Sequence, residues 1–174
     1  MDLLREHHEG LIALSACLAG RIPQAIMQED LDAAEQAARE YAEIFGPEHF
    51  YLELQDHSIP EQRTVNGQIR KLADKLGLPL VVTNDAHYLR KSDAKMQDVL
   101  LCIQTGKTVD DPNRMKFETE EFYLKSEEEL RSLFPDVPEA FENTVRIAER
   151  CNVEFTFGKY FLPEFKLPEG VTSL

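Results

Sequence analysis

The sequence predicts an α/β fold in which parallel strands alternate with crossover helices. Three short apolar runs have the length and composition of buried strands; they are residues 11–15, 50–54 and 78–83. Segments with the 3.6-residue periodicity of amphipathic helices separate these runs. Alternation of this kind favours a parallel sheet with right-handed crossovers. Ligands of such folds bind at the carboxyl ends of the strands, so a site is expected at that edge.

The composition limits the classes of function that this chain can serve alone. With 174 residues, of which 43% are hydrophobic, the chain is long enough for one domain with a core. Its net charge of −13 argues against direct binding of nucleic-acid phosphates by this chain alone, because such binding needs Lys and Arg. It does not exclude membership of a larger nucleic-acid enzyme.

Three features that the sequence does not show bear on the expected cellular location. No apolar run approaches the roughly 20 residues of a membrane span, and the polar N-terminus resembles no signal peptide. Three cysteines are too few and too scattered for a disulfide framework. We therefore expect a cytoplasmic protein without membrane contact.

Helices are expected between the strands of the first half of the chain. Their periodic segments cover residues 18–27, 31–45 and 58–76. Asp30 is the expected N-cap of the second helix, and Gly77 is the expected C-cap of the third. Ser58 and Glu61 have the spacing of a capping box at the start of the third helix.

The second half of the chain is expected to be mainly helical. Its helices are predicted at residues 92–104, 126–134 and 138–150. Ser92 is an expected cap, Ser126 and Glu129 form a second capping box, and Pro138 suits the first helical position. Segment 121–125 should be extended, and segment 153–157 alternates like an edge strand.

Apolar residues at helical spacing predict which sides of two helices face a core. For helix 92–104 they are Ala94, Met96, Val99, Leu100 and Ile103. For helix 138–150 they are Ala140, Phe141, Val145, Ile147 and Ala148. Cys102 and Cys151 lie in helical patterns and are also expected in the core.

Side chains able to do chemistry follow each predicted strand. Cys17 follows the first, residues 55–57 follow the second, and Asp85 and His87 follow the third. Two residues that are two apart share one side of an extended backbone, which would aim Asp85 and His87 at one point. Parallel strands would bring the three loops to one edge. These residue types are ligands for a metal ion.

Simpler interpretations exist for each candidate. Asp85 can start a turn with His87 packed beneath Tyr88, and a lone cysteine is more often a small buried hydrophobe. Glu53 can face a barrel interior or pair with a helix. His57 can reach the Asp85 face or shape the turn before the next helix. A multi-metal site needs more ligands, and the chain has no His-x-His pair, so the candidates form part of a site.

Several segments resemble a known family, in order and over essentially the whole chain. They are residues 10–20, 50–57, 82–89, 98–106, 121–126, 143–144 and 147–151. Together they resemble the α subunit of bacterial replicative DNA polymerase III, a C-family polymerase. The most specific pieces are Ser15-Ala16-Cys17-Leu18 and the Asp-x-His of Asp85 and His87.

The resemblance implies a domain organisation. Residues 1–90 would be the C-terminal part of a polymerase and histidinol phosphatase (PHP) domain, which is a distorted β/α barrel and is partial here. Residues 91–150 would be the helical end of the PHP region and its junction with the polymerase core. Residues 151–174 would be a linker or the entry to the palm domain.

The resemblance also implies a metal site. Cys17 would supply one ligand, and Asp85 and His87 two more, with Glu53 and His57 as accessory candidates. Family members hold zinc or manganese at a complete PHP site, whose remaining ligands come from His-x-His and later motifs nearer the N-terminus. Those motifs are absent here, so the chain alone should bind metal poorly. The site supports 3′–5′ proofreading in some members and serves as a docking surface in others.

The implied parent is a DNA-directed DNA polymerase, which adds deoxynucleoside monophosphates to a primer 3′ end. Its palm carboxylates hold magnesium and lie outside this chain, which alone should be inactive. The implied partners are DNA primer-template, dNTPs, a proofreading exonuclease subunit, the sliding clamp and the clamp loader. The alternative is a free-standing metal-dependent phosphoesterase of the PHP superfamily, in which residues 98–165 would have no place.

Overall fold

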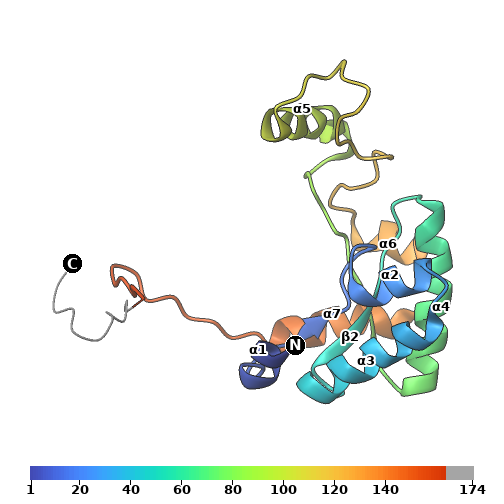
Figure 1. The fold of residues 1–174 in the computed structure, drawn as a ribbon, viewed down its shortest axis with the longest axis vertical. Helices are drawn as coiled ribbons and strands as arrows, with labels where there is room; N and C mark the ends of the chain where they lie inside the picture. The colour runs from blue at the N-terminus through green and yellow to red at the C-terminus, as the bar shows by residue number, and fades with distance from the viewer. Residues whose placement is uncertain (164–174) are drawn as a thin grey trace, which may run out of the picture.

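A computed structural model describes residues 1–163 of the chain (Figure 1). The elements in chain order are α1 (Asp2–Glu6), β1 (Ala13–Leu14), α2 (Arg21–Met27), α3 (Leu31–Phe45), β2 (Phe50–Leu54), α4 (Pro60–Leu76), β3 (Leu80–Val82), the 3-10 turn η1 (Lys91–Asp93), α5 (Ala94–Thr105), α6 (Glu127–Leu133) and α7 (Pro138–Arg150). None of the helices in this described part is both long and apolar enough to cross a membrane.

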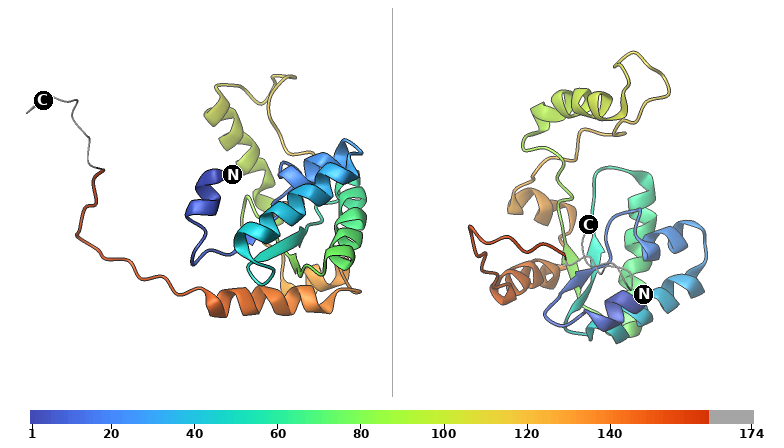
Figure 2. Two further views of the ribbon diagram at one scale, coloured as in Figure 1. Left: turned by 60° about the horizontal axis from the view of Figure 1, so that its bottom comes forward. Right: turned by 60° about the vertical axis from the view of Figure 1, so that its left-hand side comes forward.

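The expected α/β fold with parallel strands is confirmed. The three strands form one parallel sheet in the order β1-β2-β3, with Ala13 opposite Phe50 and Leu52 opposite Leu80. Helices α2, α3 and α4 pack together on one side of the sheet, and α7 lies against β3 on the other side (Figure 2). This arrangement is consistent with a partial PHP-type barrel.

The core is built around β2, whose five residues are all buried. Phe50, Leu52 and Leu54 are at most 1% exposed, and so is Ile69 of α4. Burying a Leu, Ile or Phe side chain stabilises a fold by about 1.5–3 kcal/mol relative to leaving it exposed. A central strand buried along its whole length explains why the apolar run at 50–54 was a reliable signal.

Two of the four side-chain caps expected from sequence are confirmed. Asp30 accepts a hydrogen bond from the Ala33 amide at 2.9 Å. Ser126 and Glu129 exchange both bonds of a capping box, at 3.2 and 2.8 Å. Each cap satisfies a backbone N–H that has no partner inside the helix.

The other two expected caps are wrong. Helix α4 begins at Pro60 with Ile59 as its N-cap, and Ser58 sits in a left-handed turn with φ +61°. Ser92 lies inside η1, whose entry is instead closed by a bond from the Arg90 amide to the Asp93 carboxylate at 2.9 Å. No side-chain hydrogen bond caps α4 in the described structure, and proline suits the first helical position. Helix α1 was not expected from sequence.

Residues 90–120 form a projection that we call the α5 arm (Figure 1). The arm leaves the body after Tyr88 and returns through Tyr123, and these two residues form a parallel bridge. The His87 amide donates to the Phe122 carbonyl at 2.8 Å, and the Leu124 amide donates to Tyr88 at 3.2 Å. The expected extended segment at 121–125 is therefore present and closes the base of the arm.

The predicted core face of helix 92–104 is wrong within the described residues. Met96, Val99, Leu100 and Ile103 are 66%, 41%, 55% and 72% exposed. The buried residues of α5 are Leu101, which was not predicted, and Cys102, which was expected in the core. The helix lies in the arm and not on the sheet, so its pattern has no core to meet among residues 1–163.

The end of the described chain also departs from expectation. Residues 153–157 form no strand, and Phe155 and Phe157 are exposed, because the chain after α7 runs away from the sheet (Figure 1). Val145, Ala148 and Cys151 are exposed as well, whereas Ala140 and Phe141 are buried as predicted. The rest of the predicted linker, residues 164–174, lies outside the described residues.

The capping box at α6 should contribute measurably to stability. We expect Ser126→Ala to lower the free energy of unfolding by about 1 kcal/mol, because the Glu129 amide loses its acceptor. Ser92→Ala is the matched control and should change it by less than about 0.5 kcal/mol. Urea unfolding of the two variants measures both values, and equal losses would contradict the assignment of the cap.

Candidate functional site

The loops after the three strands meet at one edge of the sheet. Because the strands are parallel, their carboxyl ends point the same way. The loops are joined by hydrogen bonds: the Ala16 amide donates to Glu53 at 2.9 Å, and Gln55 Nε2 donates to Thr83 Oγ1 at 3.1 Å. This is the edge at which the sequence places its candidate site.

Glu53 is a buried carboxylate that ties these loops together. It is 9% exposed and accepts hydrogen bonds from the Ala16 amide, from Gln55 Nε2 at 2.9 Å and from the Thr83 hydroxyl. Its own amide donates to Ser15 Oγ at 2.8 Å. A carboxylate is stable in such a place only when it is well hydrogen-bonded. Glu53 therefore bonds to the neighbouring loops and not to a helix.

The loop that carries Cys17 is tightly folded. Ala16 has φ +65°, and the Gly20 amide donates to the Cys17 carbonyl at 2.8 Å. A Cβ at Gly20 would lie 2.4 Å from the Ser15 carbonyl oxygen, so only glycine fits there. Gly20 lets this loop turn before α2 begins.

The half-buried Cys17 lies beside a small cavity. Cys17, Glu53 and Gln55 line a space of about 10 Å³, close to the volume that one water molecule needs. The Oε1 atom of Gln55 is the one buried side-chain polar atom without a hydrogen-bond partner in the described part of the chain. Cys17 and Gln55 thus line the same small cavity.

His57 holds two loops together from inside the structure. It is 1% exposed, its Nε2 lies 2.7 Å from the Asn84 carbonyl, and its Nδ1 lies 2.8 Å from Gln62 Nε2. The carbonyl can only accept, so Nε2 carries the proton and Nδ1 accepts from the amide. The ring stacks on Phe122 with centroids 4.1 Å apart. Both nitrogens are engaged, so His57 fixes the turn and supplies no free ligand atom.

Asp85 and His87 do approach each other, but for a different reason from the one the sequence suggested. Asp85 has φ +43° and is not extended, a conformation that Asp adopts more readily than most residues. His87 Nε2 lies 3.5 Å from Asp85 Oδ1, and the imidazole is 40% exposed. The His87 ring also packs against Phe117 of the α5 arm, with centroids 4.7 Å apart.

The candidates do not form a complete metal centre by themselves. Among residues 1–163, no group of three or more His, Cys, Asp or Glu side chains is placed to hold a metal ion. Asp85 and His87 supply two donors, which is fewer than the four or more ligands of zinc sites in proteins. The edge can orient part of a ligand set, and the described residues do not complete it.

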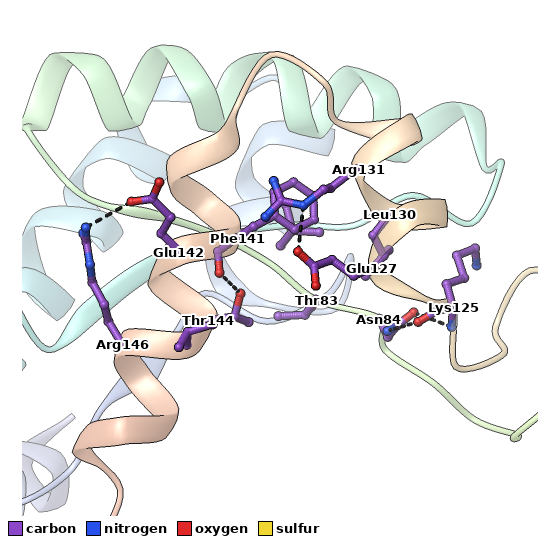
Figure 3. A pocket seen from close by; sticks show the side chains of 12 residues that line it. Thr83, Asn84, Lys125, Glu127, Leu130, Arg131, Phe141, Glu142, Thr144 and Arg146 are labelled. Carbon is purple, nitrogen blue, oxygen red and sulfur yellow. Dashed lines mark hydrogen bonds and ion pairs between the residues drawn. The ribbon is translucent and has the colours of Figure 1, made fainter.

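A groove beside the end of β3 was not expected from sequence (Figure 3). It has a volume of about 770 Å³ and is lined by Thr83 and Asn84, by Lys125 and by residues of α6 and α7. Arg131 pairs with Glu127, and Arg146 pairs with Glu142, each one helical turn away. Both pairs are exposed to solvent, so each is worth only a few tenths of a kcal/mol.

Lys125 at the rim of this groove is structural. Its side chain is 4% exposed, and burial lowers the pKa of its ammonium group, while Glu121 acts in the opposite direction. The Nζ atom lies 4.4 Å from the centre of the Tyr123 ring. The Lys125 amide and carbonyl both bond to the Asn84 side chain, at 2.9 and 3.2 Å. This pairing anchors the base of the α5 arm to the loop before Asp85.

Comparison with known proteins gives two findings. The family model of the PHP domain matches residues 1–57. Proteins named DNA polymerase III subunit alpha match almost the whole chain: that of Treponema pallidum is 48% identical over 99% of this chain, as is that of Thermus aquaticus, and that of Borreliella burgdorferi is 46% identical over 99%. The chain spans only 14–15% of the length of these relatives, or about one seventh.

The buried imidazole predicts an acid-sensitive fold. Burial lowers the pKa of His57 below its usual value of 6.5, partly opposed by the Asn84 carbonyl; nearby Lys125 lowers it further and Asp85 raises it. The unfolded chain therefore binds the proton more readily, so this stability is present above about pH 6.5 and is lost as the pH falls below it. The loss cannot exceed about 1.4 kcal/mol per pH unit for one group.

Urea unfolding at pH 7.5 and pH 5.5 measures this dependence. We expect His57→Gln to be less stable at the higher pH and to lose less on acidification than the wild type. His87→Gln keeps His57 and should follow the wild-type dependence. An identical fall in the wild type and in His57→Gln would show that His57 is not the responsible group.

Proposed function

Since the chain belongs, along the segment that it covers, to the family of DNA polymerase III α subunits, we propose that it works as part of a replicative DNA polymerase. The observation that carries this proposal is the match itself, at 48% identity over 99% of the chain. The whole protein would catalyse DNA-directed nucleotidyl transfer on a primer-template with dNTPs. Its magnesium-binding palm carboxylates would lie in the part that this segment does not include.

The charge of the segment fits a role away from the DNA backbone. A net charge of −13 disfavours direct contact with phosphates, so template binding would fall to other parts of the polymerase. The partners of such a polymerase would include a proofreading exonuclease subunit, a sliding clamp and a clamp loader. This segment would supply scaffold and part of a PHP centre.

Within the segment, Cys17, Asp85 and His87 would be its contribution to a PHP metal centre. Two features support this: the shared edge of the sheet and the 3.5 Å approach of Asp85 to His87. The remaining ligands would come from residues outside this chain. Bound zinc or manganese would act as a Lewis acid there.

Glu53 and His57 would be positioning residues for this centre. Glu53 fixes the amide before Cys17, and His57 fixes the Asn84 carbonyl next to Asp85. Ligands held by such outer hydrogen bonds lose less conformational freedom when a metal binds. The chain therefore carries both a partial ligand set and the bonds that orient it.

The alternative of a free-standing phosphoesterase is not favoured. Such an enzyme needs a complete ligand set, which residues 1–163 do not provide. It would also give no role to the α5 arm, although the matches to DNA polymerase III α subunits run through the arm.

A chimera tests the proposal. In the Treponema pallidum α subunit, the matching segment of about 172 residues would be replaced by this chain. We expect the purified chimera to extend primers and to retain zinc or manganese after desalting. Asp85→Ala should reduce the bound zinc or manganese, whereas Asp110→Ala, which removes an exposed carboxylate of the arm, should not.

Two results would contradict the proposal. A folded chimera that cannot extend a primer would remove the polymerase assignment. Tight one-to-one metal binding by the isolated chain, abolished by Asp85→Ala, would instead favour the phosphoesterase.

A further inference from the structure

Helix α5 has one face that its own arm covers. Leu101 and Cys102 are buried, and the Lys107 amide donates to the Cys102 carbonyl at 2.9 Å. Asp98 and Arg114 are joined by two bonds from guanidinium to carboxylate, one of them at 2.8 Å. The returning segment of the arm therefore packs on this side of the helix and holds it in place.

The opposite face of α5 carries a bare apolar stripe. It consists of Met96, Val99, Leu100 and Ile103. Their i, i+3, i+4, i+7 spacing puts them on one side of the helix, and each is between 41% and 72% exposed. Exposed Lys95 and Gln104 flank the stripe, which itself contains no charge.

This stripe has the pattern of a buried helix. Single exposed apolar residues are common on protein surfaces, whereas these four form one continuous apolar row on a single helix face. Figure 1 and the right-hand view of Figure 2 show α5 projecting from the body. The four apolar residues that the sequence pattern assigns to a core are therefore exposed in the described part of the chain.

We propose that the α5 stripe is the docking face for an amphipathic helix of the same polymerase chain, from the part outside this segment. The inference rests on the proposed function. Relatives carry about six times as much chain again beyond the matched 14–15% of their length, which is ample to supply such a helix. Its facing residues would be aliphatic, with a carboxylate near Lys95.

The size of the stripe favours an occupant from the same chain. Helix α5 has 12 residues, so it is about 18 Å long and about 10 Å wide. Such a face is well below the roughly 800 Å² per partner that stable complexes between separate proteins bury. A segment of the same chain meets the stripe at a high effective concentration, so a small contact suffices. A second copy of the chain lacks this advantage.

Photo-crosslinking in the Treponema pallidum chimera tests the inference. A benzoylphenylalanine at Leu100 places the probe in the stripe, and the same probe at Asn113 reports an exposed polar position elsewhere in the arm. After irradiation, mass spectrometry identifies the joined peptides. We expect Leu100 to crosslink within the same chain to an apolar segment outside residues 1–174, at least about tenfold more than Asn113.

Each other outcome overturns the inference. Crosslinks between two chimera chains would make the occupant a second copy, and crosslinks only to residues 1–174 would make it this segment itself. No excess over Asn113 would mean that nothing docks there. Leu100→Lys in the isolated chain should leave its unfolding midpoint unchanged, which separates docking from folding. If the chimera extends primers but forms no such crosslink, only the docking inference is refuted. If the chimera fails to extend primers, the proposed function is refuted.

Discussion

The buried carboxylate of Glu53 is the interaction on which the candidate site depends. It sits in the central strand and accepts hydrogen bonds from the loop after β1, from Gln55 after β2 and from Thr83 after β3. Removing it would leave several buried donors unsatisfied, at a cost of about 1–3 kcal/mol for each group. His57 adds a second link through the Asn84 carbonyl. These hydrogen bonds hold the three loops in one arrangement. Among the residues of the loops, only Cys17, Asp85 and His87 are proposed metal ligands.

Local signals predicted the sheet well, and tertiary packing explains the failures. The apolar run at 50–54 and the glycine at Gly77 were reliable because the strand is fully buried and the helix end needs a left-handed residue. The serines at 58 and 92 matched capping patterns, but neighbouring residues supply other starts for those helices. Alternation at 153–157 could not reveal that this segment forms no strand in the described part of the chain. The approach of Asp85 to His87 was expected from the right residues and the wrong backbone geometry, because the positive φ of Asp85 leaves no periodic trace in the sequence.

Two surfaces of this chain lack a partner among residues 1–163. One is the strand edge with the proposed ligands Cys17, Asp85 and His87, where residues 1–163 place no group of three or more metal-ligating side chains together. The other is the α5 stripe, whose apolar row meets no core. The base of the arm joins these surfaces, since Phe122 stacks on His57 and Phe117 packs on His87. In a protein as long as the matching relatives, of which this chain spans 14–15%, further residues would be present to complete both surfaces.

Hydrogen exchange at the Ala16 amide tests most directly whether Glu53 holds the loops together. In Glu53→Leu the amide loses its acceptor, and we predict that its exchange accelerates by at least about tenfold, the equivalent of roughly 1.4 kcal/mol. The amide of Ile69 in α4 should keep most of its protection, which would show that the change is local. Glu43→Leu, at an exposed position of α3, should leave both amides unchanged. An Ala16 amide that exchanges as slowly in Glu53→Leu as in the wild type would contradict the account.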